Sequence, residues 1–177
     1  DGDDNVMRQT SARLPWLLIG MLGGIGNSMI LGNFDTTFAA HPEMALYIPL
    51  IGGTGGNVGT QSSAIIVQGL ANSSLDAKDT FKQVAKEAVV AVINATIISL
   101  LVYIYNFIRF GATATVTYSV SISLFAVVMF ASIFGTLVPM TLEKLKIDPA
   151  IATGPFIAIT NDIIGMMLYM GITVLLS

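Results

Sequence analysis

Long apolar runs dominate this sequence and constrain its fold more than any other feature. Five runs, at residues 15–32, 42–70, 87–108, 116–142 and 149–176, have about the 20 residues that a helix needs to cross a bilayer. Charged residues make up only 11% of the chain, whereas ordinary soluble domains carry about 25%. Because backbone groups in hydrocarbon must bond to one another, the sequence predicts an all-α integral membrane protein with five transmembrane helices.

The basic residues predict the orientation of these helices, since Lys and Arg are retained on the cytoplasmic side. With a cytoplasmic N-terminus, only Arg109 falls on the outer side. The other seven fall on the inner side: Arg8, Arg13, Lys78, Lys82, Lys86, Lys144 and Lys146. We therefore expect residues 1–12 to be a cytoplasmic tail, residues 13–177 to be the five-helix membrane domain, and the C-terminus to lie outside. The opening DGDDNVMRQT lacks the features of a signal peptide.

Several function classes are disfavoured by composition and motif content. The net charge of -3 argues against nucleic acid as a partner, because phosphate contacts need a basic face. The chain has no cysteine, and its single histidine, His41, has no second ligand at metal-site spacing. We find no HExxH, GxSxG or Walker A pattern, so the sequence predicts that the protein is not an enzyme.

Asp162 is the acidic residue that lies deepest in a predicted span. It follows Ala150 by twelve residues, which places it about 18 Å along a helix and near the middle of a ~30 Å hydrocarbon core. A carboxylate at that depth costs at least ~2.5 kcal/mol and is expected to face the bundle interior, a water-filled path or a cation. We favour an ion site; the alternative is a neutral, hydrogen-bonded aspartate that ties two helices together.

Small residues precede Asp162 on the same predicted helix. Gly154, Ala158 and Asp162 are four residues apart and form one stripe, which leaves space in front of the carboxylate. A tight helix crossing would favour the same small residues. Asp148 and Pro149 form a helix-start signal, and Pro139 and Pro155 are each expected to free a backbone carbonyl within a helix.

The second apolar run contains an unusual polar segment, PLIGGTGGNVGTQSSA. Such a segment at membrane depth favours a pore wall or a gate, although its GxxxG spacings also suit helix packing. Together with one residue of the fifth run, its members form our pore-lining or gating candidates: Gly56, Asn57, Gly59, Thr60, Gln61, Ser63 and Asn161.

The ion that this chemistry suits is a hard divalent cation. One carboxylate does not neutralise a divalent charge, but a two-fold dimer brings two copies of Asp162 to a shared axis. Oxygen ligands favour Mg2+, Ca2+ or Mn2+, and a site with few carboxylates suits Mg2+ held through its own waters.

Three segments of the chain resemble the MgtE family of magnesium channels and transporters. They are RLPWLL, IPLIGGTGGNVGTQSSAIIVQGLA and KIDPAIATGPFIAITNDIIGMMLYMGI, and the resemblance extends from Arg13 onward. It implies a homodimer of five-helix subunits in the cell (inner) membrane, with the second and fifth helices lining a pore on the two-fold axis.

The resemblance also implies roles for individual residues. Asp162 from both subunits would hold a hydrated Mg2+, with Ala158 and Gly154 one and two turns before it. Asp148 would be an ion site at the cytoplasmic start of the fifth helix.

The chain departs from the family in its domain content. Many members carry a cytoplasmic N-terminal domain and a CBS pair, to which nothing here corresponds, so we expect an excised membrane domain or a short member. Two alternatives to a Mg2+ channel remain: a Na+- or H+-coupled Mg2+ exchanger, with Na+ as coupling ion, and a non-transporting membrane scaffold subunit.

Overall fold

Helices make up all the regular structure in the computed structural model, which describes residues 2–152 and 154–177. The side chains of residues 2–4 and 152 are not part of that description. Five helices are long: α1 (Gly2–Gly32), α3 (Ile48–Ala71), α4 (Thr80–Phe110), α5 (Thr115–Lys144) and α6 (Pro155–Leu176). Four are short: α2 (Asp35–Ala40) and the 3-10 helices η1 (Pro42–Tyr47), η2 (Ala77–Asp79) and η3 (Pro149–Ala152).

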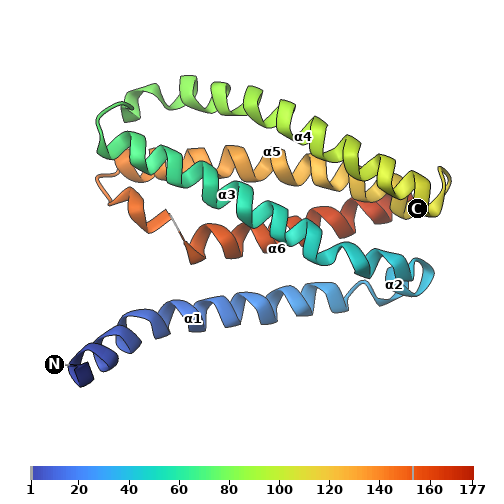
Figure 1. Ribbon diagram of the computed structural model, residues 1–177, viewed down its shortest axis with the longest axis horizontal. Helices are drawn as coiled ribbons and strands as arrows, with labels where there is room; N and C mark the ends of the chain where they lie inside the picture. Colours follow the sequence, from blue (N-terminus) through green and yellow to red (C-terminus); the bar gives the residue numbers. More distant parts are fainter. Residues whose placement is uncertain (1, 153) are drawn as a thin grey trace.

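The centre of the bundle is α5, which packs against α3, α4 and α6 (Figure 1). Val116, Val120, Leu124 and Val128 recur every four residues along α5, and all four are fully buried. Residues at this spacing share one face of a helix, so they form a continuous apolar stripe toward the neighbouring helices. As a result, α3 and α6 are held side by side on α5.

The first helix packs mainly against α6 and otherwise stands apart from the bundle (Figure 1). Its outward surface is apolar, with Leu17 and Met29 65% and 69% exposed. A helix that is apolar around its whole circumference is typical of a membrane span.

Four helical segments are long and apolar enough to cross a membrane, namely residues 5–32, 77–110, 115–144 and 155–176 of the described chain. This confirms the predicted all-α membrane class. Helix α3 has 24 residues but is not among these four, because Gly, Thr, Asn, Gln and Ser replace much of its apolar surface. The count of five spanning helices therefore stays a prediction.

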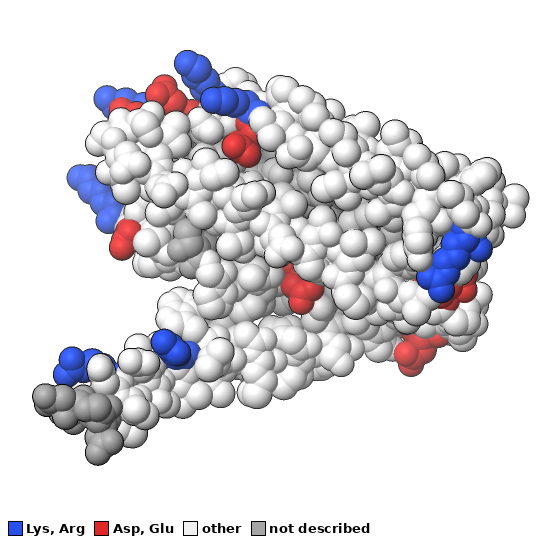
Figure 2. Space-filling view, in the orientation of Figure 1, with Lys and Arg blue, Asp and Glu red and all other residues white. Residues whose placement is uncertain are grey.

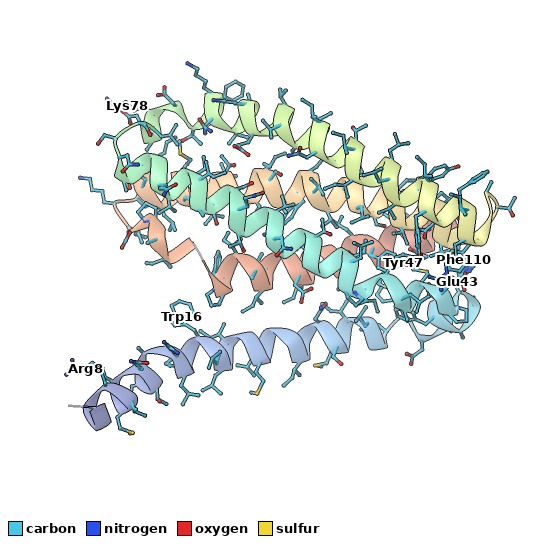
Figure 3. The ribbon with its side chains drawn as sticks, viewed as in Figure 1. Arg8, Trp16, Glu43, Tyr47, Lys78 and Phe110 are labelled. Atoms are coloured by element: carbon cyan, nitrogen blue, oxygen red, sulfur yellow. The ribbon has the colours of Figure 1, made fainter. Side chains whose placement is uncertain are left out.

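Most charged residues gather towards the two ends of the molecule, and one acidic patch lies between them (Figure 2). Arg8 and Lys78 lie at one end, whereas Glu43, Tyr47 and Phe110 lie at the other (Figure 3). The long helices run back and forth between these ends, as the distribution of basic residues predicts. Which end faces the cytoplasm stays a prediction.

The last apolar run is interrupted, so the prediction of one helix from residue 149 to residue 176 is wrong. Pro149–Ala152 form η3, Gly154 has φ +110°, and α6 begins only at Pro155. Glycine adopts positive φ readily, and proline at the first helical position needs no amide partner. The predicted start signal is confirmed locally, since Asp148 Oδ1 accepts a hydrogen bond from the Ala150 amide at 3.0 Å.

This interruption corrects two further predictions. Pro155 occupies the first position of α6, so it frees no carbonyl within a helix, whereas Pro139 does lie inside α5. Asp162 is seven residues from the start of α6, or about 10 Å along the helix, and not the predicted 18 Å.

The first helix also differs from its prediction, because α1 begins at Gly2 and continues through Pro15.

Candidate ion-binding groove

An open groove of about 620 Å³ runs between α3 and α6, and we call it the α3–α6 groove. Its walls combine small and polar residues from α3 with three residues from α6. They are Gly52, Gly53, Gly56, Asn57, Thr60, Gln61 and Ala64 on α3, and Ala158, Ile159 and Asp162 on α6.

The groove exists because of the residue spacing on α3. The pairs 52–53, 56–57 and 60–61 repeat every four residues, so they form one face of the helix. Glycines on this face leave space beside α6, and Asn57, Thr60 and Gln61 add polar groups to the same face. The structure brings six of the candidates predicted from the sequence together in this groove: Gly56, Asn57, Thr60, Gln61, Ala158 and Asp162.

The carboxylate of Asp162 lies where α1, α3 and α6 meet. Its Oδ2 accepts a hydrogen bond from Asn27 Nδ2 of α1 at 3.3 Å. Its Oδ1 lies against Gly52 of α3, in the space that a Cβ at that position would fill. Among the described residues, no Lys or Arg forms an ion pair with Asp162. The carboxylate is thus held by an amide and is available to a cation that enters the groove.

The opposite face of α3 is buried and does not line the groove. Ser63 is fully buried and donates its hydroxyl to the Thr60 carbonyl at 3.1 Å. Gly59 packs against the side chain of Asn161, which is itself 1% exposed. Neither polar atom of the Asn161 amide has a hydrogen-bond partner among the described residues. Gly59, Ser63 and Asn161 therefore form the contact behind the groove.

Two further candidates, Gly154 and Asp148, are not part of the groove lining. Gly154 precedes α6, and its carbonyl accepts a hydrogen bond from the Ala158 amide at 3.1 Å. Asp148 is exposed and caps η3. Only Ala158 of the small residues in the predicted stripe joins Asp162 in the lining. Within the described ranges, no three His, Cys, Asp or Glu side chains are grouped closely enough to hold a metal.

Sequence reasoning missed Asn27. The residue lies in the segment GGIGNSMILG, where a single amide interrupts an apolar run. A buried amide needs a hydrogen-bond partner, so an asparagine in such a run was a usable signal. The identity of its partner depends on how α1 packs against α6.

Comparison with known proteins identifies a family whose matched residues include the groove. The MgtE family, described as divalent cation transporters, matches residues 48–172, which include both walls of the groove. The chain belongs to the MgtE family. The resemblance seen in the sequence is thereby confirmed, and the chain is an integral membrane protein.

Individual MgtE relatives give the extent of the similarity. The chain is 33% identical to the magnesium transporter MgtE of Bacillus subtilis over 160 residues, which cover 90% of this chain and 35% of the relative. It is 33% identical to the magnesium transporter MgtE of Thermus thermophilus over 165 residues, which cover 93% of this chain and 36% of that relative. It is 27% identical to the magnesium transporter MgtE of Enterococcus faecalis over 169 residues, which cover 96% of this chain and 37% of that relative. The chain thus spans about a third of the length of these MgtE relatives.

Proposed function

We propose that this chain forms the membrane part of a Mg2+ transport protein. Two copies would meet about a two-fold axis, with α3 and α6 of each copy lining the pore. Asp162 of each copy would hold a hydrated Mg2+ there. The observation that carries this proposal is the α3–α6 groove, which brings Asp162 together with Asn57, Thr60 and Gln61 along one open face of the bundle.

The size of the groove supports a hydrated ion. A water molecule occupies about 30 Å³ in the liquid, so six waters around one ion need roughly 200 Å³. The groove has about 620 Å³. Mg2+ gives up its waters reluctantly and is often bound through one or two carboxylates with several waters retained. Two Asp162 carboxylates and the polar groups of α3 would accept hydrogen bonds from that water shell.

Residues outside the groove have secondary roles in this proposal. Gly59, Ser63 and Asn161 pack behind the groove and would set the separation of α3 and α6, as a gate requires. Asp148 would meet the ion at the cytoplasmic end, near the break that Gly154 makes before α6. The end that carries Arg8 and Lys78 would face the cytoplasm, with the C-terminus outside and the protein in the cell (inner) membrane.

The test is Mg2+ flux into liposomes that contain the purified chain. Asp162→Ala is expected to abolish flux while the protein elutes at the same size as the wild type. Asp35→Ala is the matched control, because it removes an exposed carboxylate outside the groove. Unaltered flux in the Asp162→Ala variant would contradict the proposal.

The same assay separates the alternatives. We expect flux that follows the Mg2+ gradient and the voltage without a Na+ or pH gradient. Flux that requires either gradient would indicate a coupled exchanger, and a wild-type chain without flux would indicate a scaffold subunit.

A further inference from the structure

Asn27 is the only buried side chain among residues 5–32 of α1. It is 9% exposed, whereas its neighbours on the outward surface, such as Met29, are largely exposed. Burying an amide is unfavourable unless it is hydrogen-bonded. The contacts of Asn27 should therefore explain why an amide occupies this position.

The contact that Asn27 makes is to the candidate ion ligand. Its Nδ2 donates to Asp162 Oδ2 at 3.3 Å, which joins two residues 135 positions apart in the chain. Its Oδ1 is buried and has no hydrogen-bond partner within the described part of the chain. The amide is thus poorly satisfied as a packing group, and its one hydrogen bond holds the Asp162 carboxylate.

This hydrogen bond makes the two oxygens of Asp162 unequal. Oδ2 accepts a hydrogen bond from the amide of α1, whereas Oδ1 faces α3 at Gly52, a residue of the groove wall. A carboxylate held in this way offers a cation Oδ1 more readily than Oδ2, because Oδ2 is held towards α1 and shares its lone pairs with the amide.

Divalent cations differ in their response to such a ligand. Ca2+ accepts six to eight oxygens and often binds a carboxylate through both of them, whereas Mg2+ keeps an octahedral shell that includes several waters. One readily available oxygen suits a hydrogen bond from a water of hydrated Mg2+. It disfavours chelation of Ca2+, which needs both oxygens.

We infer that Asn27 is a positioning residue that favours Mg2+ over Ca2+ by holding Oδ2 of Asp162. This inference deepens the proposed function and rests on it. Without the amide, Oδ2 is free to rotate toward the groove, and Ca2+ gains a second oxygen from the same side chain.

The test compares Mg2+ and Ca2+ binding to the detergent-purified chain by titration calorimetry, together with the melting temperature without either ion. Asn27→Leu keeps a similar size and removes the donor. Its preference for Mg2+ over Ca2+ is expected to fall on the order of tenfold, as for a lost hydrogen bond to a charged group. Asn33→Leu is the matched control, because Asn33 bonds to the Met29 carbonyl of its own helix at 3.3 Å.

A purely structural role for Asn27 predicts a different result. In that case Asn27→Leu lowers the melting temperature and weakens both ions equally, which overturns the inference. An effect through Asp162 also requires that Asn27→Leu add nothing to Asp162→Asn in the double variant. If the leucine variant does not fold, Asn27→Ser replaces it, because the serine hydroxyl is too short to reach Oδ2.

The Asp162→Asn variant distinguishes a failure of the proposed function from a failure of the Asn27 role alone. If it binds Mg2+ like the wild type, the proposed function fails, and the role of Asn27 fails with it. If it loses Mg2+ binding while Asn27→Leu keeps the wild-type preference, only the role of Asn27 fails.

Discussion

Asp162 Oδ1 occupies the space in which a Cβ on Gly52 would lie. The position of the Asp162 carboxylate against α3 therefore depends on the absence of a side chain at residue 52. Gly52 belongs to a GxxxG spacing that suits helix packing, within a segment for which the sequence favours a pore wall or a gate. In the structure, Gly52 both allows the Asp162 carboxylate to lie close to α3 and forms part of the groove wall.

Gly52→Ala should displace the Asp162 carboxylate and lower Mg2+ flux. The carboxylate is the end of a flexible side chain, so the cost falls on its position as an ion ligand, and a loss of about 1.4 kcal/mol in ion binding predicts a decrease of roughly tenfold in liposomes. Gly171→Ala is the control, because nothing lies within 4 Å of a Cβ at that position of α6. Equal flux in both variants would mean that the carboxylate moves aside without consequence.

Gly135→Ala should destabilise the bundle at the contact of α5 with α3. Its Cβ would lie 2.7 Å from the carbonyl oxygen of Gly59, and a backbone atom does not rotate away as a side chain does. We expect a loss of about 1–3 kcal/mol, measured as a lower melting temperature in detergent. Gly20→Ala on α1, with nothing within 4 Å, should melt like the wild type. If Gly135→Ala has the same melting temperature as Gly20→Ala, α5 and α3 move apart at little energetic cost, which contradicts this prediction.

Tyr47→Phe should destabilise the end of the bundle opposite Lys78. The buried Tyr47 hydroxyl donates to Asn106 Oδ1, and the Asn106 Nδ2 already has no partner among the described residues. Removal of the donor leaves a second buried polar atom unpaired, at a cost of about 1–3 kcal/mol in thermal unfolding. Tyr105→Phe is the control, because that exposed hydroxyl only accepts from Arg109. Similar melting of the two variants would contradict this role.

Thr60→Val should lower Mg2+ flux without changing the assembly. Valine keeps the shape of threonine but removes a hydroxyl from the α3–α6 groove. The loss of one hydrogen bond to the water shell predicts a decrease of roughly two- to tenfold. Thr96→Val is the control, since Thr96 bonds to the Val92 carbonyl of its own helix, α4. Wild-type flux in Thr60→Val would exclude a role for this hydroxyl in ion passage.

Several features could be predicted from the sequence because they depend on local physics. Apolar runs of membrane length determined the helical class, since hydrocarbon leaves the backbone no other partners. Asp148 and Pro149 predicted a helix start, and the carboxylate does cap the chain there. The GGNVGTQ segment and the single acidic residue inside the last apolar run, Asp162, indicated the two helices whose side chains line the groove.

Only the tertiary structure decided which polar residues share a surface. The sequence placed Thr60 and Ser63 in one group, yet the first lines the groove and the second is buried behind it. Their separation depends on the rotation of α3 about its axis, which its contacts with α5 and α6 set. The partner of Asp162 on α1 depended on packing in the same way, because a hydrogen bond across 135 residues leaves no periodic signal in the chain.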